Sequence, residues 1–166
     1  MAVYRAYHGS QRDFKRFDRS FRGGFGGTIG IWFASTPESV AFFAKPKFAG
    51  EPPVVFTVNL LMYNPYVLEG HEGLVAEVRR RQKGGSIEDG YRSLKRAAVR
   101  DGHDGIIVRN CTSDSGLLRD DFVVFNPKQV EIVDRTVVGK PPGGKRRHGK
   151  KRSILALAND VRRNLR

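Results

Sequence analysis

The strand-forming runs of this chain do not alternate one for one with helices, which limits the folds that it can adopt. Six such runs are predicted, at 2–7, 28–33, 54–60, 106–108, 122–125 and 129–133. One helix is expected from Ser35 to about Ala44, and two long helices, His71 to Gln82 and Ile87 to Arg100, follow each other directly. A parallel sheet of βαβ units needs a helix between successive strands. The pattern therefore predicts an α+β fold.

The composition of the chain changes after Val138, which divides it into a body and a tail. Residues 139–166 hold ten Lys or Arg and one acid, a net charge of +9, which leaves +4 of the total of +13 for residues 1–138. Residues 139–153 have no apolar anchor and are predicted to be disordered. Apolar residues return at helical spacing further on. We expect a folded domain at 1–138, a basic linker at 139–153 and an amphipathic helix at 154–166.

Length and composition exclude several classes of protein. A chain of 166 residues suits one domain with a core and is short for two. The single cysteine, Cys111, cannot form an internal disulfide, which suits a reducing compartment. The first residues lack the apolar segment of a signal peptide, and the most apolar stretch, Val54 to Met62, is too short to span a membrane. We expect a cytoplasmic protein without a membrane partner.

The first candidate site segment is His8-Gly9-Ser10, which follows the first predicted strand. A glycine permits close approach of the backbone to a ligand, and an adjacent imidazole can hold a ribose hydroxyl. A His-Gly pair at the end of a strand is also an ordinary turn, so this segment alone does not define a site.

Two aromatic residues, Trp32 and Phe43, are eleven positions apart, one on a predicted strand and one on the helix after it. Either both belong to the core, or they enclose a flat ring by stacking on its faces. Phe33 lies next to Trp32 in the same strand segment, Gly30 to Ala34.

Two neighbouring acids, Asp120 and Asp121, lie between a predicted polar loop at 110–118 and an apolar strand. Neighbours on a strand face opposite sides, so only one of these side chains can enter a cleft. A carboxylate there can stabilise the oxocarbenium-like sugar that forms when an N-glycosidic bond breaks. The alternative is that both acids are solvated.

The order and spacing of these three segments resemble the ADP-ribosyltransferase fold, and most closely the small enzymes of phage polyvalent proteins. Gly30-Ile31-Trp32-Phe33-Ala34, with Ala41 and Phe43 after it, is similar to the Gly-Ile-Tyr-Phe-Ala segment and second tyrosine of poly(ADP-ribose) polymerases. The resemblance implies a split β-sheet with flanking helices, and NAD as the substrate.

The resemblance also implies roles for individual residues. His8, Gly9 and Ser10 would bind NAD, while Trp32, Phe33 and Phe43 would line the nicotinamide site. His8 would also assist catalysis, together with Asp121, which stands where the family usually has Glu. Val40 stands where the family has a serine that bonds the carboxamide, so one polar contact would be lost.

These expectations combine into one leading function and two alternatives. The leading function is an NAD-dependent mono-ADP-ribosyltransferase that modifies a host macromolecule, expected to be a protein. The alternatives are a catalytically weak or inactive NAD-binding module, and a nucleic-acid-binding protein acting through its tail. The tail residues assigned to nucleic acid are Lys145, Arg146, Arg147, Lys150, Lys151 and Arg152. No metal is expected, because the histidines and the one cysteine lack metal-ligand spacing.

Overall fold

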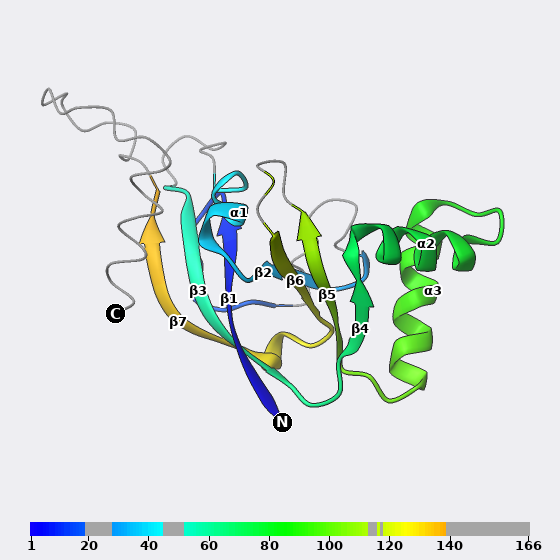
Figure 1. The fold of residues 1–166 in the computed structure, drawn as a ribbon. Coiled ribbons are helices and arrows are strands. Elements are labelled where there is room, and N and C mark those ends of the chain that lie inside the picture. Colours follow the sequence, from blue (N-terminus) through cyan, green and yellow to red (C-terminus); the bar gives the residue numbers. More distant parts are fainter. Residues whose placement is uncertain (19–27, 45–51, 113–115, 117, 139–166) are drawn as a thin grey trace, which may run out of the picture.

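The computed structural model describes residues 1–18, 28–44, 52–112, 116 and 118–138 (Figure 1). The expectations for the linker at 139–153, the helix at 154–166 and the basic tail residues lie outside the described residues. Within the described part, no helix is both long and apolar enough to cross a membrane.

Seven strands form one mixed sheet in the order β4-β5-β6-β2-β1-β3-β7. Their pairing is antiparallel except between β4 and β5, which run parallel. This arrangement confirms the α+β prediction. The strands are β1 (Ala2–Ser10), β2 (Ile31–Ala34), β3 (Val54–Met62), β4 (Tyr66–Glu69), β5 (Gly105–Thr112), β6 (Leu118–Val124) and β7 (Val130–Val137).

The sheet is split between β1 and β2. In the described part of the chain, Tyr7 and Ala34 are the one residue pair that joins these two strands. By contrast, β1 pairs with β3 along its whole length, from Ala2↔Met62 to Ser10↔Val54. Figure 1 shows β1, β3 and β7 diverging from β2, β6, β5 and β4. The predicted split β-sheet is therefore confirmed.

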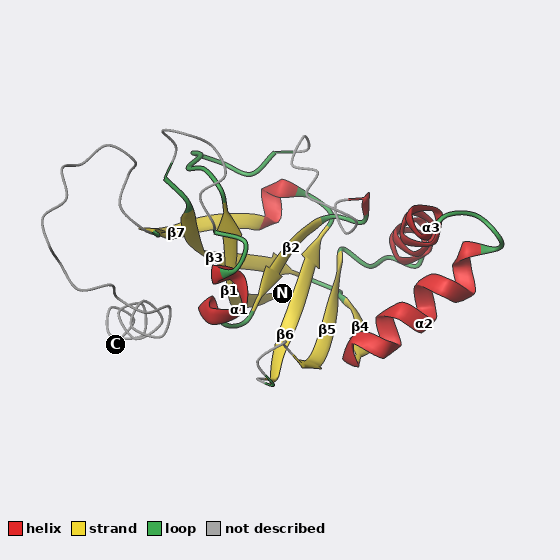
Figure 2. Cartoon of the chain, turned by 90° about the horizontal axis from the view of Figure 1, so that it is seen from above, coloured by secondary structure: helices red, strands yellow, loops and turns green. Residues whose placement is uncertain are grey.

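In the described residues, three α-helices flank the sheet: α1 (Pro37–Ala41), α2 (Gly70–Gln82) and α3 (Ile87–Arg100). Helix α3 begins with a capping box: the Asp89 amide donates to the Ser86 Oγ, and the Ser86 amide donates to the Asp89 carboxylate. Helices α2 and α3 approach closely, because a Cβ at Gly90 would lie 2.7 Å from the Val78 carbonyl oxygen. Figure 2 shows α1 beside β1 and β3, while α2 and α3 lie beside β4.

Each face of the sheet has its own core. We call the face that packs against α2 and α3 the helix face. Its core contains Val108 and Val123 of the sheet, which pack with Leu74, Val78 and Leu94 of the helices. The opposite face, the far face, carries Ala6, Phe33, Phe56, Phe122 and Val124. A smaller cluster formed by Tyr7, Ala34, Val40, Ala44 and Val55 packs α1 against the split.

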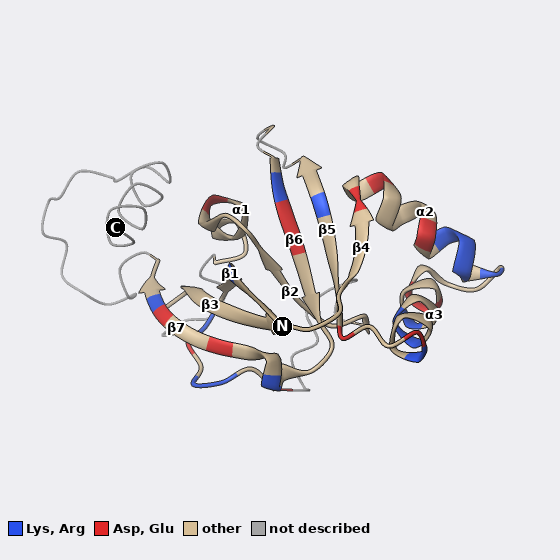
Figure 3. Cartoon of the chain, turned by 60° about the horizontal axis from the view of Figure 1, so that its bottom comes forward, with Lys and Arg blue, Asp and Glu red and all other residues tan. Residues whose placement is uncertain are grey.

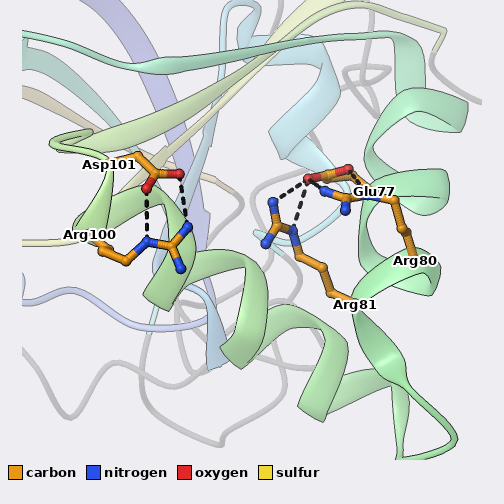
Figure 4. A network of polar contacts seen from close by, with 5 residues as sticks. All are labelled: Glu77, Arg80, Arg81, Arg100 and Asp101. Carbon is orange, nitrogen blue, oxygen red and sulfur yellow. Dashed lines mark hydrogen bonds and ion pairs between the residues drawn. The ribbon is translucent and has the colours of Figure 1, made fainter.

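An ion-pair cluster on α2 is seen close by in Figure 4. Glu77 binds Arg80 at 2.7 Å and Arg81 at 2.7 Å, within a single turn of the helix. These guanidinium groups lower the pKa of Glu77 to about 2. The carboxylate therefore stays charged far below neutral pH.

Several expected boundaries were wrong, and each affects the site. Both ends of the predicted loop at 110–118 are strand, because β5 continues to Thr112 and β6 begins at Leu118. His8 and Gly9 lie within β1 rather than after it. Phe43 lies beyond α1, which ends at Ala41. Helix α1 begins at Pro37, within the expected start segment 35–38; Thr36 is its N-cap residue, but the Thr36 side chain makes no capping hydrogen bond.

Candidate active site

His8 bridges the split between β1 and β2 with its side chain. It follows Tyr7, where the pairing to β2 ends, and its Nδ1 lies 2.8 Å from the Trp32 carbonyl oxygen. A carbonyl oxygen only accepts, so Nδ1 carries the proton and donates it. The imidazole thus replaces a backbone hydrogen bond between the two halves of the sheet.

The surroundings of His8 favour its neutral form. Its ring contacts Phe17 edge-on at 5.2 Å and Phe33 at 5.5 Å. Burial lowers the pKa of His8, and the hydrogen bond to Trp32 opposes this only in part. A neutral imidazole with the proton on Nδ1 has an acceptor at Nε2, which suits a hydroxyl donor.

Gly9 lies against the end of α1. A Cβ at this position would stand 2.1 Å from the Val40 carbonyl oxygen, so no other residue fits without moving the helix. The backbone amide of Phe43 donates to the same oxygen at 3.0 Å. The Val40 carbonyl group therefore lies against Gly9 and binds the amide of Phe43. The structure thus brings these two predicted NAD contacts close together. Next to them, Ser10 is buried and its Oγ accepts from the Arg12 amide at 3.3 Å.

The three aromatic candidates have different environments. Trp32 packs at the edge of the helix-face core, whereas Phe33 is buried on the far face, where it contacts the His8 ring. Phe43 is 59% exposed and meets Phe42 edge-on at 5.7 Å. Phe43 is thus mostly exposed and Trp32 is half-buried, while Phe33 supports His8 from the core.

Asp121 lies inside β6, opposite Ala34 of β2 and Val108 of β5. Its carboxylate is held by Arg119, with Nε 2.8 Å from Oδ1 and Nη2 3.3 Å from Oδ2. The side chains of Asp121 and Arg119 are only 12% and 23% exposed. Figure 3 shows a basic stretch followed by an acidic stretch along β6. Asp121 is therefore a sequestered, paired anion next to the split.

Asp120 is occupied with structural hydrogen bonds. Its backbone amide donates to the Ser35 Oγ at 2.9 Å, and its carbonyl accepts from the Ser35 amide at 2.8 Å. Its carboxylate accepts from the Asn110 amide at 3.1 Å. The two neighbouring acids thus have separate environments, as strand alternation requires.

A β-bulge in β5 lies opposite Asp120. The register runs from Val108↔Asp121 to Cys111↔Arg119, so two residues of β5 face one residue of β6. Asn110 occupies the left-handed region, with φ 52°, and its side-chain amide bonds Glu69 of β4. Asparagine tolerates this conformation better than most residues. Bulges re-aim side chains next to functional sites, and this one flanks the candidate acid.

The residues near the bulge do not form a nucleophile or a metal centre. Cys111 is buried, and burial together with the nearby Asp121 raises its pKa to about 11, so the thiol stays protonated. Within the described ranges, no group of three or more His, Cys, Asp or Glu could hold a metal ion. The site therefore offers a carboxylate, an imidazole and aromatic surfaces.

The helix face brings most of the candidate residues together. Trp32 and Asp121 both lie on this face. Trp32 pairs with Val123 and Asp121 pairs with Ala34, so the two residues are diagonal neighbours, two positions apart along the strands. Gly9 joins them from β1, because a Cβ at Gly9 would point at α1, which packs against Ala34. The His8 ring reaches the split from the other side, beside Phe17 and Phe33.

Two residues of this site, Arg119 and Asn110, were missed in the sequence. Arg119 had a detectable signal: it lies two positions before Asp121, and such residues share one face of a strand. Asn110 had no sequence signal of comparable strength, because the position of a bulge depends on the register of the partner strand.

The split sheet, with a carboxylate on an inner strand and an imidazole on the strand across the split, defines the ADP-ribosyltransferase class of fold. The chain belongs to the family of ADP-ribosyltransferases in polyvalent proteins, whose model matches residues 3–137. No curated protein matches the chain.

Two solved structures are similar to the chain. A chain from the crystal structure of the M. tuberculosis MbcT–MbcA toxin–antitoxin complex superposes with a TM-score of 0.51 at 15% identity, covering 82% of this chain and 85% of that one. A crystal structure of an anti-CRISPR protein gives a TM-score of 0.42 at 12% identity, covering 79% and 96%. At this identity, the first similarity supports the fold.

Proposed function

We propose that this protein is an NAD-dependent mono-ADP-ribosyltransferase that modifies a host macromolecule, expected to be a protein. The observation that carries the proposal is the position of Asp121. It is buried on β6, diagonally across from Trp32 of β2 and next to the split. The family match supports transfer of ADP-ribose as the reaction class. The proposed place of action is the host cytoplasm, where NAD is available.

The proposed reaction breaks the N-glycosidic bond of NAD. The electron pair of that bond moves to the ring nitrogen, releasing neutral nicotinamide and leaving positive charge on the ribose. An acceptor nucleophile then bonds to the ribose C1′ and loses a proton. The carboxylate of Asp121 would stabilise the developing charge, and this differential stabilisation is what accelerates the reaction.

The other residues would bind and orient the substrate. Trp32 and Phe43 would stack against the nicotinamide ring. Gly9 and Ser10 would hold it at the open end of β1, where pairing to β2 has ended. The neutral His8 would accept a hydrogen bond from a ribose hydroxyl.

Aspartate in place of glutamate favours a single transfer. The side chain of Asp121 is one methylene shorter than that of glutamate. Chain elongation requires the family glutamate to orient a second acceptor as well, and a shorter carboxylate is poorly suited to that additional role.

The test is labelling with NAD that carries its label on the adenylate half. The protein is incubated with this NAD and a bacterial lysate, and the labelled product is digested with protease or with nuclease. Protease-sensitive label supports a protein acceptor, and nuclease-sensitive label indicates nucleic acid. The matched control is Asp121→Asn, which keeps the shape of the side chain and removes its charge.

The alternative is an NAD-binding module with little or no catalysis. The observation in its favour is that Arg119 neutralises Asp121 in this structure. Nicotinamide release separates the two functions, because a binding module would be stabilised by NAD without releasing nicotinamide. The assignment of the basic tail residues to nucleic acid stays a prediction, which removal of residues 139–166 would test.

A further inference from the structure

The pairing of Arg119 with Asp121 presents a problem for the proposed reaction. A carboxylate that stabilises positive charge on a ribose must direct its own charge at that ribose. Here both of its oxygens are engaged by one guanidinium group, at 2.8 and 3.3 Å. The ion pair therefore cancels much of the charge on which catalysis depends.

Simple loss of this ion pair would be unfavourable. Both side chains are mostly shielded from water, at 23% and 12% exposure. Separating such a pair leaves two poorly solvated charges unless each finds a new partner. A substrate that breaks the pair must therefore supply an anion for Arg119 as well as a cation for Asp121.

NAD carries both charges a few bonds apart. The reacting carbon of its nicotinamide ribose becomes positive, and the same ribose bears the diphosphate. A guanidinium fork binds phosphate oxygens with two parallel hydrogen bonds, which makes arginine a better diphosphate ligand than lysine. A group already in contact with the ribose-binding acid is within reach of a phosphate on that ribose.

We propose that Arg119 exchanges partners when the substrate binds. Its guanidinium group moves from the carboxylate of Asp121 to the diphosphate of the dinucleotide. The exchange leaves the carboxylate of Asp121 without its counter-ion only when a nucleotide with a diphosphate is in place. Arg119 is thus a specificity residue that favours dinucleotides over nicotinamide ribosides lacking phosphate. This inference rests on the proposed function, because it takes NAD as the substrate.

The first experiment compares two substrates. The rate constant kcat/KM for nicotinamide release is measured with NAD and with nicotinamide riboside, which has no phosphate. For Arg119→Gln we expect the ratio of the two values to fall roughly ten- to hundredfold, the range for a lost charge-assisted hydrogen bond. Arg119→Lys keeps the positive charge without the forked guanidinium group, and its ratio should lie between those of wild type and Arg119→Gln. The control Arg96→Gln removes an exposed cation of α3 and should keep the wild-type ratio.

Two outcomes of this comparison would overturn the proposal. One is an unchanged ratio in Arg119→Gln. The other is an equal fall for both substrates, which would mean that Arg119 only orients Asp121. If wild-type protein releases nicotinamide from neither substrate, the proposed function fails instead, and a binding measurement still tests Arg119.

The second experiment needs neither catalysis nor an Arg119 variant that folds. Binding of inorganic pyrophosphate is measured calorimetrically for wild type and for Asp121→Asn, which frees Arg119 from its partner. The exchange predicts several-fold tighter binding by Asp121→Asn. Equal or weaker binding would overturn the proposal, because Arg119 would then have no tendency to take up a diphosphate.

Discussion

The backbone amide of Asn110 donates to the carboxylate of Asp120 at 3.1 Å, which fixes the β-bulge between β5 and β6. Asn110 holds a left-handed backbone there, and its side chain bonds Glu69 of β4. The carboxylate of Asp120 thus links β6 to an irregular turn of β5 next to Asp121. The two neighbouring acids thus have different partners, and only Asp121 is proposed to act on the substrate.

Substitution of Asp120 should change stability. Asp120→Ala removes the acceptor for the Asn110 amide and should cost no more than about 1 kcal/mol of unfolding free energy, because the bond is exposed. Asp120→Asn keeps a side-chain oxygen and should lose less than half of that. Urea unfolding measures both variants. Equal stability of Asp120→Ala and wild type would show that the bulge does not need this hydrogen bond.

A methyl group at Gly9 should disturb both packing and NAD binding. In Gly9→Ala the new Cβ meets the Val40 carbonyl oxygen, so α1 must shift, at a cost of about 1–3 kcal/mol. The shift displaces Phe43, whose amide bonds the same oxygen. We expect the thermal stabilisation by millimolar NAD to be largely lost.

The matched control for Gly9 is Gly73→Ala on α2. A Cβ at Gly73 would meet no atom within 4 Å, and alanine favours a helix by about 0.5–1 kcal/mol over glycine. This variant should be at least as stable as wild type and should respond fully to NAD. If Gly9→Ala behaves like Gly73→Ala, α1 does not position the site as described.

Glu77 should make the stability of the fold depend on acid pH. The pKa of Glu77 is lowered to about 2 in the folded protein, below the ordinary glutamate value of 4.5. A depressed pKa adds stability above the unfolded value, and this stability is lost as the pH falls from about 4.5 to about 2. After screening by solvent we expect a contribution of about 1 kcal/mol.

Thermal unfolding of wild type and Glu77→Gln between pH 7 and pH 2 tests this contribution. Wild type should be the more stable at pH 7, and the difference between the two proteins should shrink towards pH 2. A difference that does not change with pH would exclude the ion pairs with Arg80 and Arg81 as its source.

Local sequence signals predicted those parts of the fold that short-range chemistry determines. Helix α3 runs from Ile87 to Arg100 as expected, because a serine cap and an amphipathic stripe define it locally. Strand β4, Tyr66–Glu69, was missed because four residues carry little pattern and its parallel partner, β5, is far along the chain. Long-range pairing of this kind cannot be read from a short window.

The candidate site shows the same division. Strand alternation correctly separated Asp120 from Asp121, and their contacts with Asn110 and Arg119 differ accordingly. The bonding of His8 to the Trp32 carbonyl could not be predicted, because it depends on where the two halves of the sheet part. Residue types and periodicity thus indicated the members of the candidate site. Their hydrogen-bonding partners depend on the register of the strands, which the sequence does not show.

Nicotinamide release from NAD by three proteins, wild type, Asp121→Asn and Asp120→Asn, tests the central claim most directly. Wild type should release nicotinamide, and Asp121→Asn should be at least about a hundredfold slower, the scale for loss of one electrostatic group. Asp120→Asn should keep most of the wild-type rate, since its hydrogen bond to Asn110 survives. Release by Asp121→Asn at the wild-type rate would contradict the account.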